Sequence, residues 1–218
     1  MNIAHSLQRE VHTEAIPAEV TLQSSCTPEM IGSLSFEMAS EMYPLYRPII
    51  TKKKTLIKAA GQRDSNVTVA FNKENEIVGF GILQYPSPDE RWTKVGPQIM
   101  MEISIIEVSR PWRGMGLSKE ILELLMVPPL KEKRIIYMVG YSWTWDLVGK
   151  GMTPMGYRNM LIQIFSRNGL QVFQTNEPNI LLRTENLFMA RIGARISEET
   201  KKRFKWVRFN LDLSLLKP

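Results

Sequence analysis

The most informative segment of the chain is Ile105–Ser118, which reads IIEVSRPWRGMGLS. An apolar stretch typical of a strand runs into a glycine-containing turn, and an amphipathic helix pattern follows. Gly114 and Gly116 permit positive φ angles and let a ligand approach the backbone closely. The first N–H groups of a helix lack internal partners, and the helix dipole favours an anion beside them. The segment therefore predicts a pyrophosphate site, to which Arg113 adds a positive charge.

Two better-known phosphate motifs do not fit this turn. A dinucleotide-binding turn needs G-x-G-x-x-G and an acidic residue about 20 positions later, whereas a Walker loop needs G-K-S/T. The turn at Gly114–Gly116 has only G-x-G, and it follows several earlier elements rather than the first strand. The alternative to a ligand site is a helix N-terminus with a purely structural role.

The rest of the chain shows alternating helix and strand patterns. Helices are predicted over 28–40, 48–60, 114–126 and 154–167, and strands over 67–71, 77–84, 100–108, 135–139, 170–173, 187–192 and 203–213. Thr27 is placed to cap the first helix, and the polar residues 72–76 to close a hairpin. Residues 1–20 are expected to form an extension or an added strand, and residues 21–218 a single domain. This order predicts a mixed α/β fold.

Composition restricts the class of protein. The 218 residues carry 28 Lys and Arg against 22 Asp and Glu, a net charge of +6 that suits an acidic partner or a phosphate-rich cofactor. The Lys52–Lys54 run has no interleaved aromatic residues, so nucleic acid is not expected as a partner. No apolar run of about 18 residues is present, which argues against a membrane span. The single cysteine, Cys26, excludes an internal disulfide, and we expect a cytoplasmic location.

Histidine is scarce, and this restricts the chemistry. His5 and His12 are the only two, and both lie in the predicted extension. A histidine-centred triad or a histidine metal site in the core is therefore not expected, and we expect no metal. A general base must then be a carboxylate, a tyrosine, a lysine or water.

The turn resembles the acetyl-CoA loop of the GNAT superfamily of N-acetyltransferases, Q/R-x-x-G-x-G/A, with Ser118 where Gly or Ala is usual. The resemblance implies acetyl-CoA as co-substrate and a mixed central sheet with helices on both faces. The cofactor-binding residues that it implies are Val108, Arg113, Gly114, Met115, Gly116, Leu117 and Ser118.

Further blocks, between about Tyr46 and Phe209, are similar to the acetoin-utilisation protein acetyltransferases. They are Tyr85–Trp92, Glu102–Gly114, Trp143–Leu147, Tyr157–Arg158, Glu177–Pro178 and Met189–Gly193. Enzymes of this kind acetylate the active-site lysine of AMP-forming acetyl-CoA synthetase and switch it off, so the resemblance implies that synthetase as partner. A GNAT enzyme acting on a small amine and a non-catalytic acyl-CoA-binding module are the alternatives, and a homo-oligomer is left open.

Glu102 is the first candidate for the general base. A lysine must lose its proton before it attacks a thioester, and the apolar neighbours of Glu102 favour a raised pKa for its carboxyl. The alternative is a structural carboxylate paired with an arginine. Glu107 is the second candidate; strict alternation puts it on the opposite face unless a bulge intervenes, and a role in orienting the substrate or in bracing the loop suits it better.

Aromatic residues supply the remaining candidates. Tyr157 and Tyr141 are expected to protonate the CoA thiolate, a role that the resemblance assigns to a tyrosine; the alternative is amphipathic packing. Trp143 and Trp145, on a segment expected to be extended, and Asp146 after them are expected to line a lysine tunnel, or else to form a core-edge pair with a capping carboxylate. Trp92 is expected to anchor a protein substrate.

Overall fold

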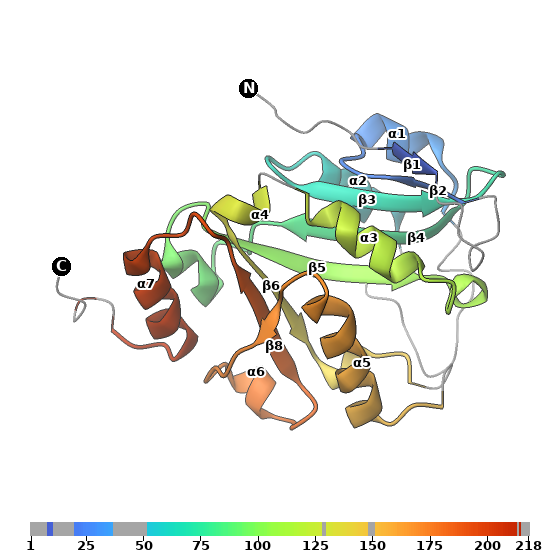
Figure 1. Cartoon of the computed structure of the whole chain (residues 1–218). Coiled ribbons are helices and arrows are strands. Elements are labelled where there is room, and N and C mark those ends of the chain that lie inside the picture. The colour runs from blue at the N-terminus through green and yellow to red at the C-terminus, as the bar shows by residue number, and fades with distance from the viewer. Residues whose placement is uncertain are drawn as a thin grey trace. The chain divides into compact units, whose positions relative to one another are not determined.

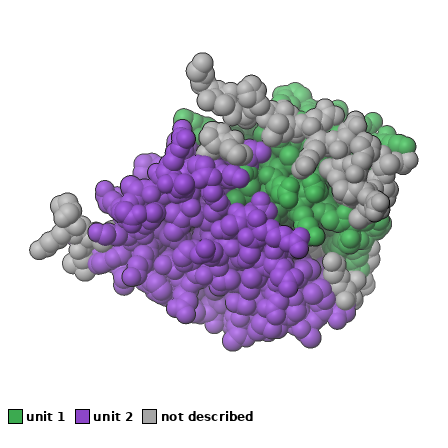
Figure 2. Space-filling model, viewed as in Figure 1, with its two compact units in different colours: residues 1–84, 103–126 green, residues 85–102, 127–218 purple. Residues whose placement is uncertain are grey.

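The computed structural model describes residues 8–10, 20–36, 52–127, 130–147, 151–212 and 214. The chain divides into two compact units (Figure 2). The first comprises residues 1–84 and 103–126, and the second residues 85–102 and 127–218. One strand, β5 (Met100–Val108), begins in the second unit and ends in the first.

The first unit is built on strands in the order β1-β2-β3-β4-β5 (Figure 1). The bounds are β1 (Gln8–Glu10), β2 (Thr21–Gln23), β3 (Asn66–Phe71) and β4 (Ile77–Gln84). The β1–β2, β2–β3 and β3–β4 pairs are antiparallel. In the predicted hairpin, which is confirmed, the Asn72 side chain accepts from the Glu76 N–H at 2.9 Å, and Asn75 takes a φ of +58°. Asparagine tolerates this left-handed conformation better than most residues, so the sequence favours the turn.

Helices cover both faces of β3 and β4. The helices are α1 (Pro28–Ser33), α2 (Lys53–Ala60) and α3 (Leu117–Leu125). Val67 and Val69 pack with Leu56 of α2, whereas the Asn66 amide, on the other face, donates to the Leu124 carbonyl of α3 at 2.9 Å. The Thr27 cap is confirmed, since its hydroxyl accepts from the Met30 N–H. Predicted helix residues 37–40 and 48–51 lie outside the described part of the chain.

The second unit contains a mixed set of strands in the order β5-β6-β8-β7. The bounds are β6 (Ile135–Gly140), β7 (Gln171–Val172) and β8 (Leu187–Ile192). β6 runs parallel to the start of β5 and antiparallel to β8, which is antiparallel to β7. The parallel and antiparallel pairs confirm the predicted mixed sheet.

Aromatic rings form the core of this unit. The ring centroids of Trp92 and Phe188 are 4.5 Å apart and stacked, and Tyr137 lies 5.6 Å from Phe188. Phe204 and Val207 of a C-terminal helix join the same cluster. The helices of the unit are α4 (Leu130–Lys133), α5 (Pro154–Ser166), α6 (Pro178–Leu181) and α7 (Glu198–Arg208), and 3-10 turns lie at Arg91–Val95 and Ser142–Thr144.

The strand predicted over 203–213 is wrong, because most of that segment belongs to α7. Alternating aromatic and basic residues favoured a strand, but Phe204 and Val207, three apart, are the residues that α7 buries. The Ser197 hydroxyl accepts from the Thr200 N–H at 3.2 Å and caps the helix. Acidic residues in the first turn and basic residues in the last also suit the helix dipole.

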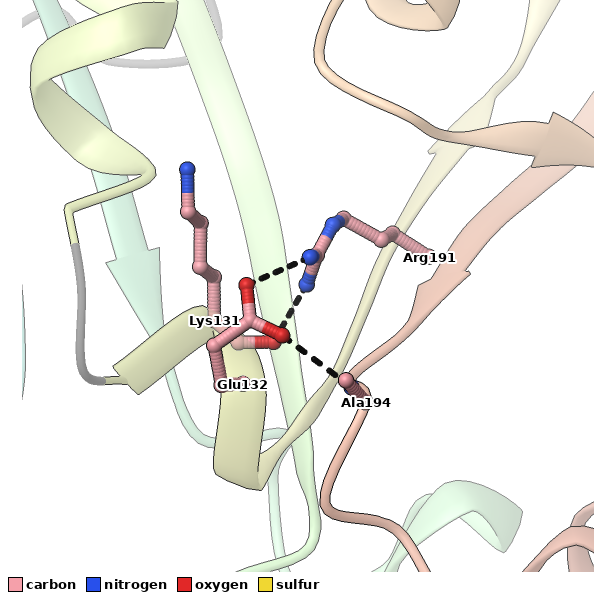
Figure 3. Close-up of polar contacts among 4 residues, drawn as sticks. All are labelled: Lys131, Glu132, Arg191 and Ala194. Atoms are coloured by element: carbon pink, nitrogen blue, oxygen red, sulfur yellow. Dashed lines mark hydrogen bonds and ion pairs between the residues drawn. The ribbon is translucent and has the colours of Figure 1, made fainter.

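A charged contact fixes the short helix α4 to β8 (Figure 3). Arg191 donates to a Glu132 carboxylate oxygen at 2.6 Å and to the Lys131 carbonyl, while the second Glu132 oxygen accepts from the Ala194 N–H at 3.1 Å. The backbone bond to Ala194 is the main reason why the pKa of Glu132 is lowered, and Arg191 lowers it further. Gly193 lies at this junction, where a Cβ atom would come within 2.5 Å of the Glu132 carbonyl oxygen.

Within the described ranges, no helix combines the length and the apolar character that crossing a membrane requires.

Gly193→Ala should lower the free energy of unfolding by about 1–3 kcal/mol, because the added methyl group meets backbone atoms that cannot rotate away. Gly32→Ala is the matched control: it adds the same methyl group inside α1, where nothing lies within 4 Å. That variant should be neutral or stabilising by up to about 1 kcal/mol. Urea unfolding followed by circular dichroism measures both, and equal midpoints for the two variants would contradict the close contact.

Candidate functional site

The turn after β5 has the geometry that an anion site needs. The Ser109 N–H donates to the Val78 carbonyl at 2.9 Å, and a 3-10 turn over Arg110–Trp112 follows. Gly114 and Gly116 then take φ angles of +88° and +86°, a region that L side chains rarely adopt. Gly116 is the N-cap of α3, so the helix begins directly after the second positive φ angle.

The N-terminus of α3 presents open backbone donors. The Gly116 carbonyl accepts the N–H groups of Lys119 and Glu120. In the described part of the chain, the N–H groups of Leu117 and Ser118 have no backbone acceptor. A Cβ atom built on Gly114 or on Gly116 would have nothing within 4 Å. The turn thus combines uncrowded glycines with amide donors that have no backbone acceptor, two features that a pyrophosphate site requires.

Arg113 braces the turn through two contacts. Its Nη2 donates to Glu107 Oε1 at 3.0 Å, and its Nε donates to the Val108 carbonyl at 2.8 Å. The side chains of Arg113 and Glu107 are 19% and 12% exposed. Glu107 therefore forms an ion pair with Arg113, and the guanidinium of Arg113 is engaged by this contact and by the Val108 carbonyl.

Close packing behind the turn fixes the direction of α3. The β4 residue Gly81 lies beneath the helix, and a Cβ atom there would come within 2.7 Å of both Ile121 and Leu125. The missing side chain lets α3 approach the strand, and Leu117 at the start of the helix is 1% exposed. The amide donors at the N-terminus are thus held by a buried helix face.

A second cluster, in the second unit, surrounds Glu102. In the parallel pairing of β5 and β6, Glu102 is opposite Tyr137. Tyr137 is fully buried, and its hydroxyl donates to Glu90 Oε2 at 3.3 Å. The other Glu90 oxygen accepts from the Ser87 N–H at 2.8 Å. Sequence reasoning missed Glu90 and Tyr137 as parts of a site; the one available signal was a tyrosine in an otherwise apolar strand, since a buried hydroxyl needs a partner.

This environment changes the acidity of Glu102. Burial, followed by the negative charge of Glu90, raises the pKa of Glu102 from 4.5 to about 7. Within the described residues, no hydrogen-bond donor contacts the Glu102 carboxyl. Burial, and then the charges of Glu102 and Glu90, also raise the pKa of Tyr137, which therefore stays protonated. The Glu102 carboxyl thus has no hydrogen-bond donor among the described residues, and its pKa suits a base that works near neutral pH.

Tyr141 and Trp143 lie just after β6. They stack with ring centroids 4.9 Å apart, and Trp143 remains 47% exposed. Burial, and next the charges of Glu177, Glu102 and Glu90, raise the pKa of Tyr141 to about 12, whereas the charge of Arg91 lowers it.

The prediction that Trp143 and Trp145 lie on an extended segment is wrong, because residues 142–144 form a 3-10 turn. The Asn186 side chain holds this turn by accepting the Ser142 N–H at 2.8 Å.

Trp145 and Tyr157 form a second stacked pair, with centroids 4.9 Å apart. Tyr157 lies in the first turns of α5, where the Thr153 hydroxyl caps the helix by accepting the Gly156 N–H. Asp146 is only 4% exposed. The two rings thus pack on each other, and the neighbouring Asp146 is buried.

Trp92 does not fit the prediction that it anchors a protein substrate. It is 3% exposed and stacks on Phe188 inside the core of the second unit. The proline-rich loop before it is instead closed on itself, because the Glu90 N–H donates to the Ser87 carbonyl at 2.9 Å. Burial of its ring stabilises the unit, whereas Trp143, which follows β6, is exposed.

The described residues contain no group of three or more His, Cys, Asp or Glu side chains that could hold a metal ion. His5 and His12 lie outside the described part of the chain. Cys26 is buried in the first unit, and burial raises the pKa of its thiol to about 12.

Comparison with known proteins places the chain among its relatives. The acetoin utilization protein AcuA of Bacillus licheniformis is 32% identical over 202 residues, which cover 93% of each protein. AcuA of Bacillus subtilis is 27% identical over 205 residues, 94% of this chain and 96% of that protein. This chain belongs to the AcuA family. No family model matches the chain.

A solved structure supports the same assignment. The crystal structure of an acetoin utilization protein from Exiguobacterium sibiricum has a TM-score of 0.82 and 25% sequence identity, and covers 96% of this chain and 97% of that one. The resemblance to the acetoin-utilisation proteins, inferred from the aromatic blocks, is thereby confirmed, and so is the α/β fold.

Gly116→Glu should weaken acetyl-CoA binding at least about tenfold more than Gly116→Ala does, because only the former puts a carboxylate beside the open amide donors. The two variants carry the same strain at a φ of +86°, so their difference isolates the charge. Isothermal calorimetry of the folded proteins measures both affinities. If the two folded variants bind acetyl-CoA equally well, this turn is not the phosphate site.

Proposed function

We propose that this protein is a protein-lysine Nε-acetyltransferase that transfers the acetyl group of acetyl-CoA to the active-site lysine of an AMP-forming acetyl-CoA synthetase, and so inactivates the synthetase. Membership of the AcuA family supports the reaction class and a link to acetoin utilisation. The observation that carries the chemistry is Glu102, an open carboxyl whose pKa is raised to about 7. This activity corresponds to a cytoplasmic protein.

The first step is deprotonation of the lysine. At pH 7, removing a proton from an amine of pKa 10.4 costs about 4.6 kcal/mol, at about 1.36 kcal/mol per pKa unit. A carboxylate that accepts this proton as the amine attacks the thioester offsets part of the cost. Glu102 suits the role better than Glu107, whose carboxylate is paired with Arg113 at 3.0 Å.

The second step is attack on the acetyl carbonyl carbon, which breaks the C–S bond and releases the CoA thiolate. We propose that the pyrophosphate of acetyl-CoA is held by backbone amides from Met115 to Ser118 at the start of α3. Tyr141 is the first candidate to protonate the thiolate, because a pKa of about 12 keeps its hydroxyl protonated at neutral pH. Tyr157 is the second, although its ring already packs on Trp145.

The surface near Tyr141 suits a protein substrate. Trp143 stacks on Tyr141 and is 47% exposed, and the guanidinium of Arg183 lies 5.9 Å from the Trp143 ring centroid. Leu181 and Leu182, next to Arg183 in sequence, are 67% and 69% exposed. Exposed aromatic and aliphatic side chains beside an arginine are typical of a protein-binding surface.

Glu102→Gln should lower kcat by about 10²- to 10⁴-fold while leaving acetyl-CoA affinity largely unchanged, because it keeps the shape of the side chain and removes the proton acceptor. In the wild type, activity should fall as the pH drops below about 7, since the carboxyl is then protonated. The loss caused by the variant should shrink as the pH rises, because more of the target lysine is already neutral. Steady-state kinetics from pH 6 to pH 10 measures all three effects.

Glu107→Gln is the matched control, because it makes the same change on the same strand. It breaks the ion pair with Arg113 and should raise the Kd for acetyl-CoA more than it lowers kcat. The reverse pattern, with full turnover in Glu102→Gln and none in Glu107→Gln, would exchange the roles of the two carboxylates.

Incubation with acetyl-CoA and purified acetyl-CoA synthetase should acetylate one lysine of the synthetase and abolish its activity. Mass spectrometry of the digested synthetase identifies the position, and a synthetase with arginine in place of that lysine should remain unmodified. Trp143→Ala should raise KM for the synthetase with little change in KM for acetyl-CoA, because it trims an exposed ring. Rapid acetylation of small amines with no modification of the synthetase would replace this proposal by the small-amine alternative.

A further inference from the structure

The loop before the first 3-10 turn of the second unit holds a second carboxylate, Glu90, in one orientation. The Ser87 N–H donates to Glu90 Oε1 at 2.8 Å, and the Glu90 N–H donates back to the Ser87 carbonyl at 2.9 Å. The Glu90 carbonyl accepts the Thr93 hydroxyl at 2.7 Å. Backbone and side chain of Glu90 are thus fixed by the same short segment.

The remaining Glu90 oxygen is directed to the core of the unit. It accepts the hydroxyl of Tyr137 at 3.3 Å, and Tyr137 is fully buried beside the ring of Trp92, with centroids 5.5 Å apart. Tyr137 is also the residue opposite Glu102 in the β5–β6 pairing. Each Glu90 oxygen therefore accepts a hydrogen bond within the protein, whereas the Glu102 carboxyl has no donor partner among the described residues.

We propose that Glu90 is a positioning residue for Glu102: its carboxylate, fixed by the Ser87 N–H and the Tyr137 hydroxyl, holds a second negative charge beside the base and so strengthens Glu102 as a proton acceptor. This inference rests on the proposed role of Glu102. It assigns different tasks to two carboxylates of one partly buried cluster, since Glu90, which is hydrogen-bonded, supplies the charge and Glu102, which has no donor partner among the described residues, takes the proton.

The ionisable groups around Glu102 support this division. Glu90 faces it from the loop, and Tyr137 and Tyr141 from β6 and the residue after it. Both tyrosines are neutral near pH 7, because their pKa values are raised. Arg91 and Glu177 act on Tyr141, and neither is among the causes of the Glu102 shift. Glu90 is thus the charged group that acts on Glu102 within the described chain.

Glu90→Gln should move the acidic limb of the kcat profile to lower pH. Burial is the first cause of the raised pKa of Glu102 and the Glu90 charge the second, so removing that charge should lower the pKa only in part and leave it above the ordinary value. At pH 8, kcat should fall a few-fold because a weaker base accepts the proton less readily, while KM for acetyl-CoA stays unchanged.

Two further variants separate charge from packing. Asp89→Asn removes a negative charge from the neighbouring residue, which is exposed. The acidic limb of its kcat profile should coincide with that of the wild type. Glu90→Asp keeps the charge on a shorter side chain, and its limb should lie between those of the wild type and Glu90→Gln. A limb that moves as far in Glu90→Asp as in Glu90→Gln would show that packing, not charge, is responsible, and would overturn the proposal.

A measurement that needs no turnover completes the test. Titration of the Glu102 carboxyl by ¹³C NMR, assigned with Glu102→Gln, should give a lower pKa in Glu90→Gln than in the wild type. Glu90→Met replaces Glu90→Gln if the latter does not fold. An unchanged Glu102 titration in the charge-free variant would overturn the role of Glu90 while leaving Glu102 as the base. Full activity in Glu102→Gln would instead show that Glu102 is not the base. Failure of the Glu90 proposal can therefore be told apart from failure of the proposed role of Glu102.

Discussion

The turn between β5 and α3 must satisfy opposing demands on a few backbone atoms. It has positive φ angles at Gly114 and Gly116, and the N–H groups of Leu117 and Ser118 have no backbone acceptor within the described part of the chain. Such a turn is flexible by itself, because glycine increases the conformational entropy of the unfolded chain and because unpaired N–H groups lack the hydrogen bonds that stabilise a helix. The ion pair of Arg113 with Glu107 and the burial of α3 over Gly81 supply the missing constraint. The open donors are thus kept in place by neighbours that do not occupy them.

The same chain shows how environment assigns roles to chemically identical groups. Glu107 is paired with a guanidinium, Glu132 accepts from Arg191 and a backbone N–H, and Glu90 accepts from a backbone N–H and a buried hydroxyl. Each of these carboxylates stabilises local structure as an acceptor. Glu102 differs, since burial and a like charge make its ionised form less favourable. A carboxylate whose ionised form is destabilised binds a proton more tightly than an ordinary carboxylate does. For this reason Glu102 is suited to act as a base.

Local pattern predicted most of the elements that carry these groups. The β3–β4 hairpin, β5 and β8 follow from apolar runs bounded by polar turns, and the glycine turn follows from residue type alone. The α7 segment was misjudged because Phe204 and Trp206 alternate like a strand, whereas helix caps and the packing of Phe204 with Val207 override that alternation. The hydrogen bond of Tyr137 to Glu90 joins residues 47 apart, so no local pattern could reveal it. Burial of Trp92 has the same origin, because it depends on rings from β6 and β8.

A raised pKa at Glu102 has a cost for the fold. With a pKa of about 7 in the folded protein and 4.5 as the ordinary value, the carboxyl binds its proton more tightly in the folded state. Its contribution to stability is therefore complete below pH 4.5 and is lost as the pH rises towards 7 and beyond, a loss of about 3 kcal/mol at most, at about 1.36 kcal/mol per unit. The Trp92, Tyr137 and Phe188 rings, which pack on one another in the core of the second unit, bury apolar area that can offset such a loss. The packing energy of the aromatic core of the second unit thus allows a carboxylate to remain in a place that raises its proton affinity.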